Sequence, residues 1–304
     1  MIRARAEAVC LGVLMVLMLC ASPVSAEPRM VKVLDGIYTY VGGEGVDSNS
    51  TAIVTREGVV VIDTRVSPIE ANKLLAAIRE RTDQPVRYVI NTHYHGDHTF
   101  GNQVFSNTAV IMAHKNVRAS LGDENGKKHL DFFKTRNLPG LDDVKITLPN
   151  IVYEDKLELV TGGTRLRLIH IGRGHTDGDT AVFLPERRTL IAGDLISNKV
   201  IPYMADAYVD DWIVFLSELE KFDAEIIIGG HGDVGDKPML IQMKHYLMEL
   251  RNNVESQLAG KKTLQQTKDA VRPILQERFG DWAKQDRLDA NIERAYQEYK
   301  MKGR

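Results

Sequence analysis

Short apolar and alternating segments occur in two separate stretches of the chain. In the first stretch, residues 37–63 alternate like strands broken by turns, and residues 86–90 have the continuous apolar character of a buried strand. Between them, residues 69–81 place Leu74 and Ile78 on one face of an amphipathic helix. The first stretch therefore predicts strands, then a helix, then a strand.

A second stretch, which starts near residue 157, repeats this order after a connecting helical segment. Its expected elements are strands at 157–159, 166–169, 181–184 and 190–192, a helix from about 210 to 221 and a buried strand at 225–228. Two similar halves favour two sheets packed face to face with helices outside. The expected fold class is therefore α/β, with four layers in the order αβ/βα.

The last part of the chain has a helical pattern. Apolar residues recur at helical spacing over 240–258, Gly260 is placed to end that helix, and residues 263–266 resemble a capping box. Residues 288–299 give a final amphipathic helix. We expect a C-terminal helical extension over 241–304 that packs on the domain, with a dimerisation arm as the alternative.

The first 26 residues differ in character from the rest. Arg3 and Arg5 precede an apolar run over 9–20, and small residues follow at 24–26. This is the pattern of a secretory signal peptide, because so short an apolar run cannot comfortably span about 30 Å of hydrocarbon. We therefore expect removal of residues 1–26, no membrane span afterwards, a globular domain over 27–240, and a secreted or periplasmic protein.

Composition and charge narrow the possible chemistry. The chain is 43% hydrophobic and 26% charged, and its formal net charge of −2 offers no basic excess for a nucleic-acid partner. Both cysteines, Cys10 and Cys20, lie in the signal-like segment, so the mature protein would contain no thiolate. Any metal site must then use histidine and carboxylate ligands, and the expected partner is a small-molecule substrate. The sequence predicts no oligomeric state.

Histidines cluster in short motifs, the first of which spans residues 92–98 and reads Thr-His-Tyr-His-Gly-Asp-His. Residues two apart on an extended segment point the same way, so His93 and His95 can converge on one ion. Asp97 and His98 then turn toward a second ion close by. Nitrogen and carboxylate ligands suit Zn²⁺, with iron or manganese left open.

Two further histidines lie in glycine-flanked motifs, and the remaining four do not. The glycine-flanked ones are His175, in Gly-His-Thr, and His231, in Gly-His-Gly. The other four have no such surroundings, and we expect them to be surface or core residues: His114, His129, His170 and His245.

These motifs, in this order, resemble those of the metallo-β-lactamase superfamily over roughly residues 35–240. The matching pieces beside the histidine motifs are Ile62-Asp63-Thr64, Asp179 four residues after His175, and Ala192-Gly193-Asp194. The resemblance implies a metallo-β-lactamase sandwich that holds two zinc ions per chain. One ion would be bound by His93, His95 and His175 and the other by Asp97, His98 and His231, with Asp194 bridging both. Asp63 is expected to hold ligands in place.

Local sequence is most similar to secreted class B β-lactamases, with three departures. Asp194 stands where the most similar subclass has a cysteine ligand, Ser197 where a lysine grips the drug's carboxylate, and Tyr203 where an asparagine often lies. The ion site is thus similar to that of lactonases and thioesterases, whereas the carboxylate clamp is expected to be missing. Lys199 is the residue that could compensate. β-Lactam turnover is therefore expected to be weak.

The resemblance implies a zinc-dependent hydrolase that cleaves an ester-like or amide-like bond (β-lactam, lactone or thioester) with a zinc-held hydroxide. Asp97 would be the catalytic residue, holding the nucleophile and passing its proton to the leaving atom. The alternatives are an iron-dependent oxidative enzyme on the same fold, a β-lactamase proper, and a non-catalytic binding protein. Residues 42–47 are expected to form either a flap over the substrate or a plain hairpin turn. Tyr94 and Tyr203 lie in either the cleft or the core.

Overall fold

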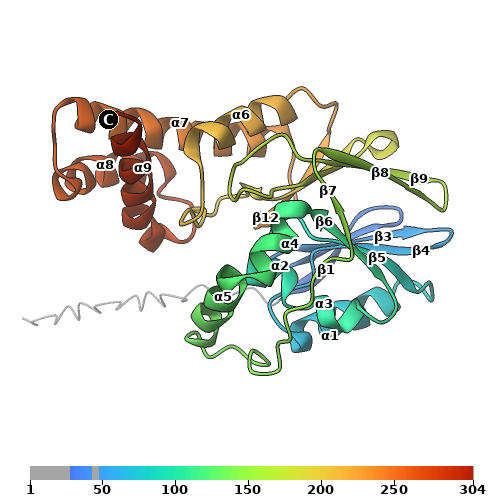
Figure 1. Ribbon diagram of the computed structural model, residues 1–304. Coiled ribbons are helices and arrows are strands. Elements are labelled where there is room, and N and C mark those ends of the chain that lie inside the picture. Colours follow the sequence, from blue (N-terminus) through green and yellow to red (C-terminus); the bar gives the residue numbers. More distant parts are fainter. Residues whose placement is uncertain (1–27, 43–47, 304) are drawn as a thin grey trace, which may run out of the picture.

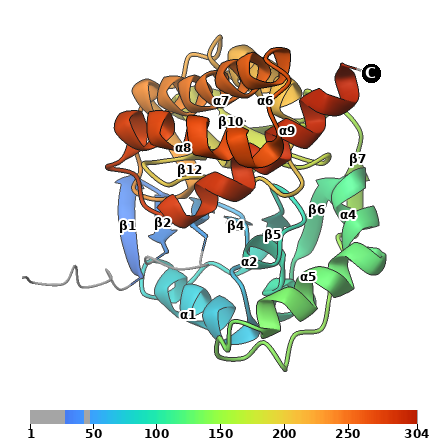
Figure 2. The ribbon, with the colours of Figure 1, turned by 90° about the vertical axis from the view of Figure 1, so that its left-hand side faces the viewer.

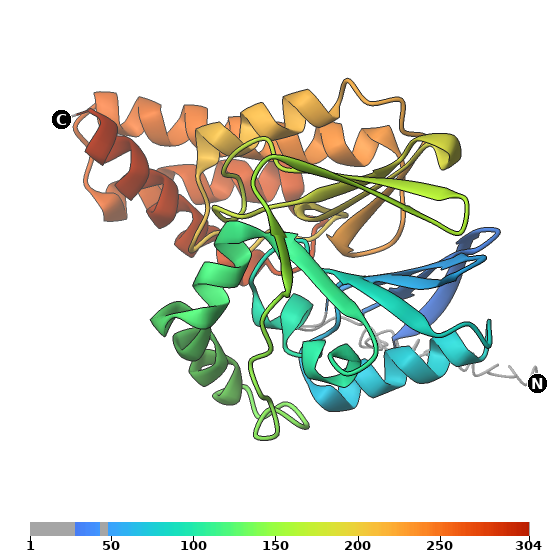
Figure 3. The same cartoon turned by 45° about the vertical axis from the view of Figure 1, so that its right-hand side comes forward.

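The computed structural model describes residues 28–42 and 48–303. They form two sheets that face each other, with helices on the outer face of each (Figure 1), and Figure 3 shows the same layers from another side. This confirms the predicted four-layer αβ/βα arrangement. The predicted signal peptide, and nearly all of the predicted flap, lie outside the described residues.

The first sheet has seven strands in sequence order. Their bounds are β1 (Arg29–Leu34), β2 (Ile37–Val41), β3 (Ser50–Thr55), β4 (Gly58–Ile62), β5 (Val86–Ile90), β6 (Val110–His114) and β7 (Ile151–Tyr153). Pairing is antiparallel from β1 to β4 and parallel from β4 to β7. The carboxyl ends of β4 and β5 therefore lie at the same edge of the sheet, where their following loops meet.

Five helices accompany this sheet. They are α1 (Pro68–Arg79), α2 (Gly96–Thr99), α3 (Asn102–Phe105), α4 (Lys115–Gly122) and α5 (Glu124–Lys134). Helix α1 begins where Ser67 accepts a hydrogen bond from the Glu70 backbone at 3.3 Å, with Pro68 in the first turn. Its Leu74 and Ile78 pack on the outer face of the sheet, as the amphipathic pattern predicted.

The second sheet has the strand order β12-β11-β10-β9-β8. Its strands are β8 (Lys156–Thr161), β9 (Thr164–Ile169), β10 (Ala181–Leu184), β11 (Thr189–Ser197) and β12 (Ile226–His231). A 3₁₀ turn, η1 (Pro185–Arg187), joins β10 to β11. Only β11 and β12 pair in parallel, and helix α6 (Val209–Leu219) connects them across the outer face.

The core between the sheets follows from strand periodicity. In β4, Val60 and Ile62 face the second sheet, whereas Val59 and Val61 face α1. Val182 and Ile228 of the second sheet pack in the same cluster as Val60 and Ile62. Because both faces of the central strands are covered, these strands read as continuous apolar runs rather than as alternating ones.

The C-terminal part consists of three helices: α7 (Lys237–Ala259), α8 (Leu264–Phe279) and α9 (Leu288–Lys302). The predicted capping box is present, because Thr263 and Gln266 each accept a hydrogen bond from the other's backbone. Side chains of all three helices share one apolar cluster with α6 and the second sheet. Figure 2 shows α8 and α9 stacked beside α7 at one end of the molecule.

Strands β1, β6 and β7 were not predicted. Strand β7 has three residues, too few for periodicity to register, and β1 is a half-exposed strand at the sheet edge. Strand β6 lies in the segment between the two predicted halves, which was interpreted as helical. Over 28–42 and 48–303, no helix combines the length and the apolar character needed to cross a membrane.

Candidate metal centre

The predicted ligands come from segments that meet at one edge of the two sheets. His93 and His95 follow β5, and Asp97 and His98 lie on the short helix α2. His175 is in the loop between β9 and β10. The final two predicted ligands belong to neighbouring parallel strands: Asp194 to β11 and His231 to the end of β12.

Gly230 allows those two strands to approach. A Cβ atom at this position would lie 1.9 Å from Asp194 Oδ1, so a larger residue could not stand beside that carboxylate. The lack of a side chain at the glycine that precedes His231 in the sequence motif is therefore a steric requirement.

The structure brings all seven predicted ligands together in two groups. Within each group the ligand atoms lie within 4.8 Å of one another. The groups are His93, His95, His175 and Asp194, and Asp97, His98 and His231. They match the two ligand sets that the family resemblance implied. The assignment of ions to them remains a prediction.

Asp194 lies between the two groups. Its Oδ2 atom is 3.4 Å from His175 Nε2 and 3.3 Å from His231 Nε2. Its Oδ1 atom is 3.1 Å from His98 Nε2. One carboxylate thus contacts ligands of both groups, which is the position that a bridging ligand requires.

The spacing of the ligand atoms is close to that of a tetrahedral metal site. Ligand atoms about 2.0–2.2 Å from a tetrahedral ion lie roughly 3.3–3.6 Å apart. Here His95 Nδ1 lies 3.0 Å from His175 Nε2, and Asp97 Oδ2 lies 3.4 Å from His231 Nε2. Within the described part of the chain, the buried Nε2 atom of His93 has no hydrogen-bond partner. Because a buried polar atom without a partner is unfavourable, the donor set fits a cation at this position.

Asp63 orients ligands without being one. Its carboxylate lies 2.7 Å from His98 Nδ1 and accepts hydrogen bonds from Thr92 N at 2.8 Å and Thr92 Oγ1 at 2.7 Å. Thr92 Oγ1 in turn lies 3.0 Å from His93 Nδ1. These contacts leave the Nε2 atoms of both rings to face the cluster. The prediction that Asp63 holds ligands in place is confirmed.

Asp206 orients His95 in the same way, and sequence reasoning missed it. Its Oδ2 atom lies 3.0 Å from His95 Nε2, so that Nδ1 of the ring faces the other ligands. Burial disfavours the charged form of Asp206, but His95 outweighs it and lowers the pKa of Asp206 to about 2. The only sequence signal was its place in the family-like segment 206–212.

The two groups differ in how their histidines hold protons when no ion is bound. Burial acts to lower the pKa of His231, but Asp194 and Asp97 outweigh it and raise the pKa to about 9. The pKa of His98 is raised as well, against burial, mainly by Asp194 and Asp63. In the other group, burial lowers the pKa of His175 to about 3. An ion bound by His175 would therefore meet a neutral imidazole, whereas an ion bound by His98 and His231 would displace protons.

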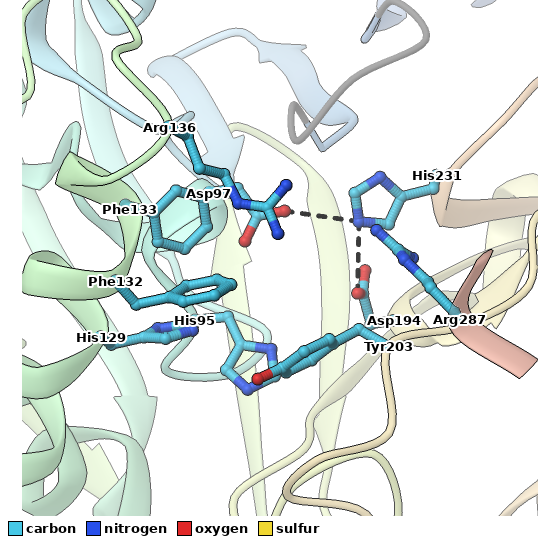
Figure 4. A pocket seen from close by; sticks show the side chains of 10 residues that line it. All are labelled: His95, Asp97, His129, Phe132, Phe133, Arg136, Asp194, Tyr203, His231 and Arg287. Atoms are coloured by element: carbon cyan, nitrogen blue, oxygen red, sulfur yellow. Dashed lines mark ion pairs between the residues drawn. The ribbon is translucent and has the colours of Figure 1, made fainter. Parts of the chain in front are cut away.

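A small pocket of about 40 Å³, partly open to solvent, lies above the cluster (Figure 4). Four predicted ligands form its floor: His95, Asp97, Asp194 and His231. An aromatic wall rises from α5 and from the segment after β11: His129, Phe132, Phe133 and Tyr203. Two guanidinium groups, those of Arg136 and Arg287, complete the lining.

His129, expected to be a surface or core residue, lines the pocket. Its ring lies 4.7 Å from that of His95, and its Nδ1 accepts a hydrogen bond from Gly96 N at 3.2 Å. Helix α5 folds back over α2, a contact that no local pattern reveals.

The other three histidines without a motif lie outside the pocket lining. His114 stacks on His170 with ring centroids 3.8 Å apart, and His245 is exposed on α7. Of the two tyrosines left open, Tyr203 lines the pocket, and Tyr94 is buried behind His95.

Comparisons with known proteins agree with the fold and the motifs. Residues 43–231 match the family model described as the metallo-beta-lactamase superfamily. The chain is 26% identical to the metallo-beta-lactamase type 2 of Bacillus cereus over 207 residues, which are 66% of this chain and 73% of that protein. It is 28% identical to the metallo-beta-lactamase IND-1 of Chryseobacterium indologenes over 201 residues, 64% of this chain and 76% of that protein.

Among solved structures, the metallo-beta-lactamase from Pontibacter korlensis superposes with a TM-score of 0.63 at 20% identity. The match covers 73% of this chain and 99% of that one, and at this identity it establishes the fold alone. The family model spans more than half of the chain and includes the segments that carry all seven predicted ligands. The chain therefore belongs to the metallo-β-lactamase superfamily.

Proposed function

We propose that this protein is a zinc-dependent hydrolase that cleaves an ester-like or amide-like bond in a small molecule, in the class of β-lactams, lactones and thioesters. One observation carries the proposal. Two groups of ligand-type side chains are in contact through Asp194, and members of both groups form the floor of a pocket that is open to solvent.

Two zinc ions held by these groups would lower the pKa of a shared water and polarise the substrate carbonyl. The chain's own residues supply positioning and proton transfer. Asp97 borders the pocket and is 8% exposed, so its carboxylate is the group that can hold the attacking water. The water oxygen bonds to the carbonyl carbon, and the bond to the leaving oxygen, nitrogen or sulfur breaks. Asp97 would take the proton that the water loses and return it to that leaving atom.

The aromatic wall of the pocket can also bind an apolar part of the substrate. Phe132 is 39% exposed, and its ring centroid lies 6.4 Å from that of Tyr203 in the same wall. An apolar part of the substrate packed against this wall would exclude water from the bond that is cleaved. This arrangement suits a partly apolar small molecule.

We also propose that the enzyme acts outside the cytoplasm, after removal of residues 1–26. The basic start, apolar run and small residues of that segment support this location. N-terminal sequencing of the exported protein should find a start at or near Glu27. Exported protein that retained residues 1–26 would contradict the proposal.

A β-lactamase proper is the second candidate. It is favoured by relatives that are named metallo-beta-lactamases and that match about two thirds of this chain. Against it stand the three sequence departures at Asp194, Ser197 and Tyr203.

A hydrolysis screen tests both candidates. Purified protein loaded with zinc is assayed against β-lactams, lactones and thioesters, beside the Asp97→Asn variant at matched zinc content. We expect turnover of at least one class, reduced by at least a hundredfold in the variant. Protein purified without added metal that contained iron and consumed dioxygen would favour the oxidative alternative. Zinc-loaded protein that hydrolysed none of the three classes would count against a hydrolase.

A further inference from the structure

We infer that Arg287, assisted by Arg136, binds a carboxylate of the substrate, so that the compound hydrolysed at the metal centre is an anion. Arg287 comes from the C-terminal extension, 56 residues beyond the end of the family match at residue 231. The inference rests on the proposed hydrolase function and names the class of its substrate.

The first observation is where the guanidinium group lies. Arg287 is the last residue of the 3₁₀ turn η2 (Gln285–Arg287), which precedes α9, and it lines the pocket together with Asp194 and His231. Figure 4 shows its guanidinium reaching into the pocket from one side, and that of Arg136 from the other. Arg287 Nη1 donates a hydrogen bond to the Ile201 carbonyl at 3.0 Å, which fixes the group in place. A guanidinium has five N–H donors in a planar fork, so donors remain for a ligand.

The second observation is charge. Across 28–42 and 48–303, neither Arg287 nor Arg136 forms an ion pair, although the nearby cations of the extension do. Lys268, for example, lies 2.6 Å from Glu293, and Arg272 lies 2.8 Å from Asp289. Burial lowers the pKa of Arg287 and Arg136 lowers it further, against Asp194 and Asp97, yet a guanidinium keeps its charge at any physiological pH. Among the described residues, neither cation of this pocket is within ion-pair distance of a carboxylate, and a substrate carboxylate would provide such a partner.

The third observation is what the extension does to the neighbouring segment. Ile201 N donates to Ala283 O at 2.9 Å, and Ala283 N donates to Lys199 O at 2.8 Å. The Lys199 ammonium lies 2.8 Å from Asp281, on the exposed side of this contact. These contacts with the extension hold Lys199 outside the lining of the pocket to which Arg287 contributes.

The expected absence of a carboxylate clamp concerned position 197, and this arrangement offers cations from elsewhere in the chain. Ser197, where a lysine was expected in related enzymes, is 2% exposed and does not line the pocket. Lys199 does not compensate, since it pairs with Asp281. The pocket nevertheless contains two cationic groups. Arg287 comes from the turn before α9, and Arg136 comes from the segment after α5.

The aromatic wall defines the rest of the ligand. The Arg136 guanidinium lies 4.8 Å from the centroid of the Phe132 ring, so charge and apolar surface are adjacent. A compound with a carboxylate and an apolar or aromatic group on either side of a cleavable carbonyl matches this lining. A planar guanidinium binds a carboxylate through two parallel hydrogen bonds, which fixes the orientation of such a compound.

Paired substrates test the inference. The zinc-loaded protein is assayed with the mono-p-nitrophenyl ester of glutarate and with the same ester whose free carboxylate is converted to a primary amide. We expect Arg287→Gln to lower kcat/KM for the acid by tenfold to a hundredfold, and for the amide by less than twofold. Arg287→Lys should retain part of the preference for the acid. Arg278→Gln is the matched control, because Arg278 is exposed, pairs with Glu249 and lies outside the pocket lining.

A binding measurement separates this inference from the proposed function. The affinities of zinc-loaded protein for 4-phenylbutyrate and 4-phenylbutyramide are compared by calorimetry, with unfolding temperatures recorded for each variant. Weaker binding of the carboxylate by at least tenfold in Arg287→Gln supports the inference even if no ester is hydrolysed, in which case only the hydrolase proposal fails. Unchanged binding and unchanged acid preference in both Arg287→Gln and Arg136→Gln would overturn it, because the carboxylate would then bind elsewhere. Should Arg287→Gln unfold, Arg287→Lys and Arg136→Gln decide the same question.

Discussion

The Asp63 carboxylate lies 2.7 Å from His98 Nδ1, and both side chains are almost completely buried. This contact selects which nitrogen of the ring faces the cluster, because the nitrogen bound to the carboxylate is not free to bind an ion. Asp63 itself has a positive φ of 62°, a conformation that residues other than glycine rarely adopt. The local backbone is therefore held in an uncommon conformation at the point where it supports a predicted ligand.

Replacing Asp63 with Ala should weaken zinc binding by tenfold to a hundredfold, since ligand-orienting partners commonly have effects of that size. Competition with a chromophoric chelator measures the change. Thr92→Val is the companion variant, because it removes the Oγ1 contact to Asp63 and keeps the carboxylate beside His98. Its effect should be smaller. An Asp63→Ala protein with unaltered zinc affinity would show that the carboxylate supports the fold alone.

Replacing Asp194 with Ala should reduce the metal content below two ions per chain and abolish hydrolysis. Asp194 contacts ligands of both groups, at 3.4 Å from His175 and 3.3 Å from His231. Elemental analysis of the dialysed protein measures the first effect. Asp233→Ala serves as the control, since Asp233 is an exposed carboxylate two residues from His231 that pairs with Arg29. A variant at 194 with full metal content and activity would rule out the bridging assignment.

How much of the site could be predicted depended on distance along the chain. The run from His93 to His98 is local, and its spacing alone indicates convergent ligands. His129 and Arg287 reach the same pocket from α5 and from the turn before α9, and Asp206 contacts His95 from the segment before α6. No local motif marks His129 or Arg287, because tertiary packing brings them to the pocket.

For the fold as well, elements with a local sequence pattern could be predicted, and those set by distant partners could not. Strands with both faces covered, such as β4, produce apolar runs that the sequence shows clearly. The short strand β7 is set by its pairing with β6, and the close contact of residues 199–201 with Ala283 is set by a long-range bridge. Both depend on partners far away in the sequence, so no periodicity could predict them.

Zinc binding to the metal-free protein should release protons at pH 7. His231 has a pKa raised to about 9, so it is protonated at that pH before an ion binds. Because its folded pKa lies above the ordinary value of 6.5, its contribution to stability is full below about pH 6.5 and is lost as the pH rises through about 9. Zinc affinity should accordingly rise with pH up to about 9.

Calorimetric titration of zinc in two buffers of different ionisation enthalpy measures this release. His231→Gln should release fewer protons than the unmodified protein. Proton release that did not differ between the two proteins would mean that His231 is neutral before zinc binds. Thermal unfolding of the metal-free protein gives an independent check, since its unfolding temperature should fall between pH 6.5 and pH 9.

Introducing a lysine at position 197 should not create a carboxylate clamp. The most similar subclass has a lysine at this position, but Ser197 is 2% exposed and ends the buried strand β11 beside His231. A lysine there would bury an ammonium group without a partner or displace the strand that carries Asp194. We expect an unfolding temperature several degrees lower and no gain in turnover of a carboxylated β-lactam. Ser197→Ala, which adds no charge and little volume, should unfold close to the unmodified protein. A gain in turnover for Ser197→Lys at unchanged stability would show that this position reaches the pocket, and that Arg287 is not the cation that binds the carboxylate.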